Sequence, residues 1–150
     1  MQPCFSSSVF IFPMFLHFAA PSERQFLQIG EYIRDFELDN RGLKKEQFCA
    51  AFDQDKLLGF GRLWQHSDCI ELCSLGVIPS HRNKGIGKAI TAKLIAHTQR
   101  PIYLTCIIPH FFVPFGFKEV SVYPSSIQEK LDYCRESLPV EETYVAMRLD

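Results

Sequence analysis

The sequence predicts one α/β (α+β) domain with a mixed sheet and helices on both of its faces. Its 150 residues are enough for one compact core and too few for two ordinary domains. The hydrophobic share of 47% and the charged share of 22% are typical of a folded globular chain. Extended runs and helix-like segments interleave without a strict strand–helix–strand repeat, which favours a mixed sheet. No internal repeat or low-complexity linker interrupts the chain, so we expect residues 1–150 to form a single domain.

The N-terminal half contains signals for one helix and three strands. Ser22 and Gln25 form a capping-box pattern ahead of apolar residues at helical spacing, which predicts a helix over about 23–37. The runs EQFCAAF and KLLGFGRLW flank a polar Gln-Asp turn, which is a hairpin signal. The apolar run CIELCSLGVI, residues 69–78, predicts the next strand, and the proline after it ends that strand.

The C-terminal half is expected to alternate helices and short strands. Apolar residues recur at helical spacing over 86–97, and the run IYLTCII predicts a buried strand after that helix. PHFFVPFGF predicts a turn or a short helix, and FKEVSVY predicts another strand. Ser125 and Gln128 are placed to cap a helix over SIQEKLDYCRESL, and TYVAMRL closes the chain as a strand.

The N-terminal stretch SVFIFPMFLHFAA has the apolar character of a signal-peptide core. It lacks a basic segment before it, and Pro13 with its neighbouring phenylalanines favours an extended strand. The stretch is also too short to span a bilayer. We therefore expect a cytoplasmic protein without membrane association, and Met14 leaves open whether residues 1–13 are an N-terminal extension of the fold.

Charge and cysteine content exclude several classes of partner. Lys and Arg total 16 against 17 Asp and Glu, and a net charge of −1 provides no broad positive field for a nucleic acid. The cysteines show no CxxC pair and no zinc-finger spacing with histidine, so no metal site is expected. Free thiols in a reducing compartment are favoured over disulfides for all six, at positions 4, 49, 69, 73, 106 and 134.

The segment HRNKGIGKAI, residues 81–90, places two glycines among cations immediately before a predicted helix. The first turn of a helix has main-chain N–H groups without internal partners, and the helix dipole adds positive charge there. Glycines let a phosphate approach those N–H groups closely, and Arg82, Lys84 and Lys88 add charge nearby. The segment therefore predicts a pyrophosphate site, with a glycine-softened helix start among solvated cations as the alternative.

Two common phosphate-binding motifs do not fit this segment. The dinucleotide pattern GxGxxG requires a third glycine where Ile90 stands, and an acidic residue about 20 positions later that is missing. The Walker pattern requires Ser or Thr after its lysine, but Ala89 follows Lys88.

A third pattern fits. VIPSHRNKGIGKAI resembles the acetyl-CoA signature of the Gcn5-related N-acetyltransferase (GNAT) superfamily, in which R/Q-x-x-G-x-G/A follows a strand ending in Val-x-Pro. The matching residues here are Arg82, Gly85 and Gly87, preceded by Val77 and Pro79. The later FGF segment is similar to the family's closing GF, which makes the match more specific than the short motif alone.

The resemblance covers about residues 19–149 and implies a mostly antiparallel central sheet with a splayed fourth and fifth strand pair. It also implies acetyl-CoA as co-substrate, with no metal. Main-chain groups of Leu75 and Val77 would pair with the pantetheine arm, and the Val77 amide would face the acetyl carbonyl oxygen. The pyrophosphate would lie against the amides of Arg82, Asn83, Lys84, Gly85, Ile86, Gly87 and Lys88.

Acetyl transfer to an amine requires a base. A lysine-like ammonium with a pKa near 10.4 costs roughly 4–5 kcal/mol to deprotonate at neutral pH. Glu71 is the only acid in the apolar run over 69–78, and its spacing before Arg82 resembles that of the glutamate base in the histone-acetylating branch. Strand alternation places Glu71 on one face with Leu75 and Val77 unless a bulge intervenes. The alternative is a surface carboxylate at a strand edge.

The expected general acid departs from the family pattern. Many members have a tyrosine four residues before the glycine of the GF segment, but Phe112 stands there and has no proton to give. His110 is nearby and is our candidate donor to the departing thiolate, with a purely structural role as the alternative. A thiol of ordinary pKa, about 8.5, can also leave without a dedicated acid.

The nature of the acceptor is less constrained. LTCIIPHFFVPFGFKEV is similar to the C-terminal half of N-acetylglutamate-synthase-type acetyltransferases, which implies an amino acid or small amine as acceptor. Trp64, His66 and Phe48 are candidates to line the acceptor cleft, with core packing as the alternative. The thiol of Cys73 could in principle carry the acetyl group in a covalent route, but no basic residue in the sequence pairs with it.

These patterns predict an N-acetyltransferase that moves the acetyl group of acetyl-CoA to a primary amine by direct attack, with Glu71 as general base. Its partners would be acetyl-CoA and the amine, and a monomer and a homodimer both remain open. One alternative is a non-catalytic acyl-CoA-binding sensor or interaction module of the same fold. Another is a structural domain without affinity for CoA.

Overall fold

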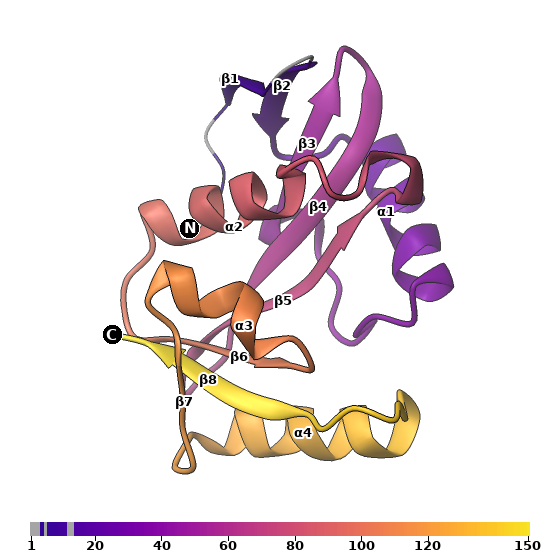
Figure 1. Cartoon of the computed structure of the whole chain (residues 1–150). Helices are drawn as coiled ribbons and strands as arrows, with labels where there is room; N and C mark the ends of the chain where they lie inside the picture. Colours follow the sequence, from indigo (N-terminus) through magenta and orange to yellow (C-terminus); the bar gives the residue numbers. More distant parts are fainter. Residues whose placement is uncertain (1–3, 5, 12–13) are drawn as a thin grey trace. The chain divides into compact units, whose positions relative to one another are not determined.

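A computed structural model describes residue 4, residues 6–11 and residues 14–150 (Figure 1). The chain forms two compact units. The first holds the described residues up to Leu63 together with Ser74–Thr98, and the second holds Trp64–Cys73 and Gln99–Asp150. The single domain over residues 1–150 stays a prediction.

Hydrogen bonds connect the strands in the order β1-β2-β3-β4-β5-β6-β8-β7. The pairs β1/β2, β2/β3, β3/β4, β6/β8 and β7/β8 are antiparallel, and β5/β6 is parallel. The predicted mixed, mostly antiparallel sheet is therefore confirmed. The strands are β1 (Ser7–Ile11), β2 (Met14–Ala19), β3 (Phe48–Asp53), β4 (Lys56–Gln65), β5 (Ile70–Val77), β6 (Ile102–Cys106), β7 (Lys118–Glu119) and β8 (Val145–Leu149).

The helices lie close to their predicted ranges. They are α1 (Glu23–Asp35), α2 (Ile86–Ala96), α3 (Pro109–Phe112) and α4 (Ser125–Ser137). The capping box of α1 is confirmed, because the Gln25 main-chain N–H donates to Ser22 Oγ at 3.2 Å and the Ser22 N–H donates to Gln25 Oε1 at 2.8 Å. Short 3₁₀ turns occur at Lys45–Gln47, Pro79–His81 and Val113–Phe115.

In the first unit, helices cover both faces of the sheet. Ile29 of α1 is fully buried in one cluster with Phe60 of β4. The neighbouring Gly59 and Gly61 face α2, since a Cβ on either would come within 2.9 Å of the Ile90 or Leu94 side chain. Adjacent strand residues point to opposite faces. Helices α1 and α2 therefore pack on opposite faces, as predicted.

The N-terminal apolar stretch is extended, as its composition predicts. Strands β1 and β2 form an antiparallel pair in which Phe10 lies opposite Phe15. Both rings are exposed. The predicted effect of Pro13 lies outside the described residues. No helix in the part of the chain that the structure describes is long and apolar enough to cross a membrane.

One expectation about the cysteines is wrong. Cys4 and Cys49 form a disulfide across a sequence separation of 45 residues, which their sequence spacing does not reveal. The pairing brings a residue before β1 next to β3. Cys69, Cys73, Cys106 and Cys134 remain thiols.

The second unit has its own small core beneath α4. Ile127 and Leu131 of α4 pack with Tyr103 of β6 and Ala146 of β8. The parallel register of β5 with β6 consists of Ile70 opposite Ile102 and Glu71 opposite Tyr103, at the start of β5. Two strands that splay apart are expected to pair only over a short stretch, as β5 and β6 do.

Two local expectations in this unit need correction. Only Lys118–Glu119 of the predicted strand FKEVSVY is a strand, because Val120 turns toward the core beneath α4 while Val122 is exposed. The predicted Ser125/Gln128 cap of α4 is also wrong. Pro124 is the N-cap residue and offers no side-chain bond, and Asp68 from the β4–β5 connection accepts the Ser126 N–H at 3.1 Å instead.

Candidate functional site

The glycine segment after β5 has the geometry of a helix start with accessible main chain. Gly85 is the N-cap residue of α2 and adopts a left-handed φ of 82°, which favours glycine. A Cβ there would meet no atom within 4 Å, so the backbone conformation, and not crowding, requires the glycine. The side chain of Ile86 is buried and anchors the turn, while Lys84 and Lys88 are exposed. The segment therefore presents unpaired helix N–H groups beside cations.

Arg82 fixes the path of this segment. Its Nε donates to the main-chain oxygen of Val77 at 3.0 Å, and its guanidinium carbon lies 5.0 Å from the centre of the Phe36 ring. The side chain is exposed. Arg82 thus ties the end of β5 to the turn that follows, in addition to supplying charge. The neighbouring Asn83 also has a left-handed φ, of 62°.

Strand β5 does not alternate regularly along its length. Ser74 has a left-handed φ of 53° in the middle of the strand, which marks an irregularity of the bulge type. Beyond it, a Cβ on Gly76 would meet Phe36 and Phe60, whereas the half-buried Leu75 lies near Gly61 on the α2 side. The predicted common face of Glu71, Leu75 and Val77 requires a strand that alternates regularly. The irregularity at Ser74 interrupts this alternation between Glu71 and the other two residues.

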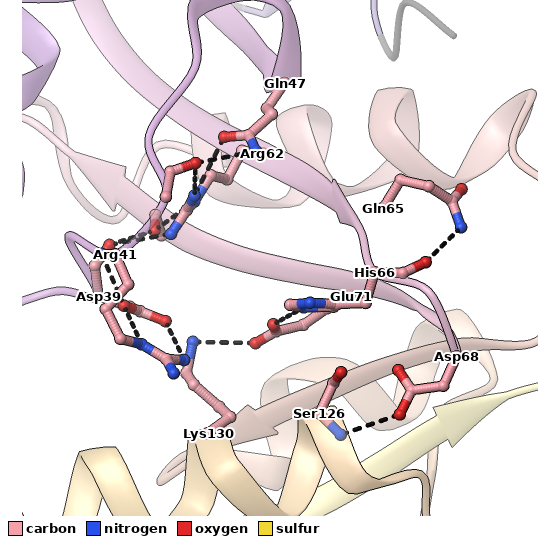
Figure 2. Close-up of polar contacts among 12 residues, drawn as sticks. Asp39, Arg41, Gln47, Arg62, Gln65, His66, Asp68, Glu71, Ser126 and Lys130 are labelled. Carbon is pink, nitrogen blue, oxygen red and sulfur yellow. Dashed lines mark hydrogen bonds and ion pairs between the residues drawn. The ribbon is translucent and has the colours of Figure 1, made fainter.

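A buried arginine holds this irregularity in place (Figure 2). Arg62 of β4 is fully buried. Its Nε donates to Ser74 Oγ at 2.9 Å and its Nη1 to Gln47 Oε1 at 3.0 Å. Its Nη2 donates to the main-chain oxygen of Asp39 at 3.2 Å, which also accepts the Ser74 hydroxyl at 2.8 Å. The guanidinium thus connects β4, β5 and the segment after α1.

Glu71 lies in a second buried polar cluster, within the other unit. Figure 2 shows its carboxylate between the His66 imidazole and the Lys130 ammonium. Oε1 lies 2.8 Å from His66 Nε2, and Oε2 lies 2.9 Å from Lys130 Nζ. The Glu71 side chain is 0% exposed, and that of Lys130 is 5% exposed. The alternative of a surface carboxylate at a strand edge is therefore wrong.

The partners of Glu71 set its ionisation. Burial alone would raise the pKa of the carboxyl, because the charged form is poorly solvated inside the protein. The Lys130 charge and the hydrogen bond with His66 outweigh burial, so the pKa of Glu71 lies below its ordinary value. The carboxylate is therefore ionised at neutral pH and can attract a proton, although no solvent reaches it directly.

His66 follows β4 and connects this cluster to solvent. Its imidazole packs on the Trp64 ring at a centroid distance of 4.3 Å, and 13% of its side chain is exposed. Its main-chain N–H donates to the oxygen of Cys69 at 2.8 Å, which fixes the tight β4–β5 connection. Trp64 is half-buried. Phe48, the third residue predicted near the acceptor, is fully buried against Phe60 and belongs to the core of the first unit.

Lys130 is the member of the cluster that sequence reasoning missed. It lies on α4 between Ile127 and Leu131, on the face that also buries Cys134. A charged residue on the apolar face of an amphipathic helix was the signal that could have found it. Its partner could not be named from the sequence, because Glu71 lies 59 positions earlier on another element.

The remaining candidates occupy the second unit. His110 is exposed on α3. Phe112 is 5% exposed and packs against Phe111 and Phe117, so it is a core residue. Cys73 is buried at 7% exposure, which disfavours a covalent route through its thiol. No group of three or more His, Cys, Asp or Glu side chains in the described ranges is placed to hold a metal ion.

Solved structures with the same fold include proteins that bind CoA. Rv2747 from Mycobacterium tuberculosis, in complex with CoA and NLQ, is 19% identical, with 88% of this chain and 97% of that chain covered and a TM-score of 0.71. N-acetylglutamate synthase from Neisseria gonorrhoeae, complexed with coenzyme A and N-acetyl-glutamate, is 16% identical over 90% of this chain and 35% of that chain, with a TM-score of 0.69. Naa50 from Arabidopsis thaliana, in complex with the bisubstrate analogue CoA-Ac-MVNAL, is 14% identical, with 90% and 98% covered and a TM-score of 0.61.

At these identities the likeness shows the fold, and it includes the N-acetylglutamate synthase similarity predicted from the sequence. A search of curated proteins found no significant sequence match. The family model described as "Acetyltransferase (GNAT) family" matches residues 12–117, which is more than half of the sequence. The chain belongs to the GNAT family of acetyltransferases.

Proposed function

We propose that this protein transfers the acetyl group of acetyl-CoA to a primary amine by direct attack of the amine on the thioester. The observation that carries the proposal is the left-handed Gly85 at the start of α2, with exposed cations on either side, inside a GNAT-family match. The structural neighbours determined with CoA support it.

Acetyl-CoA would bind along the end of β5 and the segment after it. Main-chain groups of Leu75 and Val77 would pair with the pantetheine arm as an added strand does. The main-chain N–H groups over 82–88 would hold the pyrophosphate, since anions are stabilised at a helix N-terminus. The Val77 amide would face the acetyl carbonyl oxygen as an oxyanion donor.

Glu71 is the proposed general base of the transfer. Its carboxylate is ionised, which is the protonation state that a general base requires. His110 is the proposed proton donor to the CoA thiolate, because it is exposed and Phe112 has no proton to give. We favour a small molecule or amino acid over a protein as acceptor, supported by the fold shared with N-acetylglutamate synthase.

A binding and turnover experiment tests the proposal. CoA release is measured over a panel of amino acids, polyamines and peptides, and thermal unfolding is followed with and without acetyl-CoA. A ligand at tenfold its Kd should stabilise the protein by about 1.4 kcal/mol. Release with at least one amine supports the transferase. Stabilisation without release would support the acyl-CoA-binding sensor, and no stabilisation would contradict both.

Arg82→Ala tests the binding segment directly. Loss of the Val77 contact and of one cation should weaken acetyl-CoA binding by about tenfold or more, measured by calorimetry. Arg34→Ala is the matched control, because Arg34 is also an exposed arginine of the first unit but lies on α1. Equal affinities in the two variants would exclude Arg82 from the binding site.

A further inference from the structure

We infer that the tip of the β3–β4 hairpin takes part in binding the co-substrate, with Lys56, His81 and Lys84 binding the 3′-phosphate of CoA. The inference rests on the proposed acetyl-CoA binding and deepens it, because it names residues that recognise one further group of the co-substrate. All three residues belong to the first unit. CoA carries this phosphomonoester on its ribose, in addition to the diphosphate that the segment over 82–88 is proposed to hold.

A main-chain hydrogen bond connects β4 to the start of that segment. The N–H of Ile78, which follows β5, donates to the oxygen of Leu58 on β4 at 2.8 Å. Lys56 is the first residue of β4, two positions before Leu58. The 3₁₀ turn Pro79–His81 follows Ile78 directly, and the His81 N–H donates to the Ile78 oxygen at 2.8 Å. Lys56 and His81 therefore each lie within three residues of one bond between the two chain segments.

The charges that act on His81 show that the side chains are close as well. Burial is the largest cause that lowers the pKa of His81, and the positive charges of Lys56 and Lys84 lower it further. Of the two acids in the hairpin turn, Asp53 and Asp55, Asp53 opposes this effect. Charges act on an imidazole in this way only from nearby, because solvent and salt screen distant ones. The two lysines therefore produce a positive field at His81, in which an anion is stabilised.

These groups are available to a ligand. Lys56 and Lys84 are exposed, and within the described part of the chain neither ammonium forms an ion pair. His81 is half-buried, and its Nδ1 lies 2.9 Å from Ser80 Oγ. Its Nε2 has no hydrogen bond to any described residue. An anion can therefore bind here without breaking an existing side-chain contact.

A phosphomonoester has the chemistry that this set of donors requires. Its second pKa is about 6, so it carries nearly two negative charges at neutral pH, and its three terminal oxygens accept hydrogen bonds from several donors. Only the ribose separates the 3′-phosphate of CoA from the diphosphate. A diphosphate bound over 82–88 therefore keeps the 3′-phosphate beside the segment that carries His81 and Lys84. The set is expected to distinguish CoA from its 3′-dephospho form.

Calorimetry with acetyl-CoA and with acetyl-3′-dephospho-CoA tests the inference. Wild-type protein should bind acetyl-CoA about tenfold more tightly, since each exposed ion pair contributes modestly and several act together. Lys56→Gln should reduce this preference to about threefold or less, with the affinity for the dephospho compound changed by less than about twofold. Lys56→Arg should keep the preference. Lys44→Gln is the matched control and should leave both affinities unchanged, because Lys44 is an exposed lysine of the same unit that precedes β3.

An NMR titration of His81 provides a second readout. A bound phosphomonoester should raise the pKa of His81, because it places negative charge beside the imidazole. Acetyl-CoA should therefore raise this pKa more than the dephospho compound does. Binding of the dephospho compound shows that each variant is folded, and Lys84→Gln replaces Lys56→Gln if that variant is not.

The outcomes separate this inference from the proposed function. Wild-type protein that binds neither compound would overturn the proposed function. Equal affinity of the wild type for the two compounds would overturn only the inference. An unchanged preference in Lys56→Gln, or a pKa of His81 that responds equally to both compounds, would also overturn the inference and leave the proposed function standing.

Discussion

Two buried charges in this protein have opposite kinds of partner. In the first unit, Arg62 donates to a serine hydroxyl, a glutamine amide oxygen and a main-chain carbonyl. In the second unit, Glu71 lies between an imidazole and an ammonium. Both side chains are fully buried. The partners named for Arg62 are neutral acceptors, whereas both partners of Glu71 are ionisable side chains.

The difference separates a charge held by neutral acceptors from a charge whose ionisation depends on its partners. A buried cation bonded to neutral acceptors is satisfied in one geometry, so Arg62 fixes the left-handed Ser74 and with it the course of β5. The Glu71 carboxylate keeps its low pKa through its ionisable partners, so removing one of them changes its ionisation. Burial alone therefore does not distinguish the two clusters, and the chemistry of their partners does.

The largest expected effect comes from Lys130→Met, which removes the cation but keeps the volume of the side chain. The uncompensated Glu71 charge should lower the free energy of unfolding at about pH 7 by about 3–5 kcal/mol. Lys118→Met is the control, because Lys118 is exposed in the same unit. Urea unfolding measures both variants. A loss below about 1 kcal/mol would show that the ion pair between Lys130 and Glu71 contributes little to stability.

The same variant should reverse the pH dependence of stability. In the wild type the pKa of Glu71 is lower folded than unfolded, so its contribution is present above about pH 4.3 and is lost as the pH falls through the folded value. Without Lys130, burial should raise the folded pKa above the unfolded one. The variant should then gain stability as the pH falls from about 7 toward about 5, relative to the wild type. Parallel curves would contradict this assignment.

Arg62→Met should be the next largest change. It removes the guanidinium donor from the acceptors on Ser74, Gln47 and Asp39, at a cost of roughly 3 kcal/mol. Arg62→Lys should recover part of it through a single donor group. The loss should be constant between about pH 6 and about pH 8, because these acceptors do not titrate there. A pH-dependent loss would remove the contrast with the Glu71 cluster.

The smallest effect on stability is expected for Arg82→Met. Arg82 also donates to a main-chain oxygen, but it is exposed, so water can replace the lost bond at a cost of about 0.5 kcal/mol. Thermal unfolding compares it with Arg62→Met. If the two variants lost similar stability, burial would not be the reason for the importance of Arg62.

Patterns with a short range were predicted well from the sequence. The capping box before α1, the β3–β4 hairpin and the α2 segment with Gly85 depend on residues within a few positions of one another. The cap of α4 was predicted wrongly because its acceptor, Asp68, is 58 residues away from Ser126. The Cys4–Cys49 disulfide was missed for the same reason, because the two cysteines are 45 residues apart.

The sequence by itself determined the family of this protein, because the Arg82–Gly85–Gly87 pattern needs only a strand before it and a helix after it. Only the tertiary structure decided the environment of Glu71. Its partners His66 and Lys130 come from a loop and a distant helix, and the irregularity at Ser74 depends on Arg62 of another strand. The pKa and accessibility of a side chain depend on what surrounds it in space. The spacing of residues along the chain does not indicate which distant residues those will be.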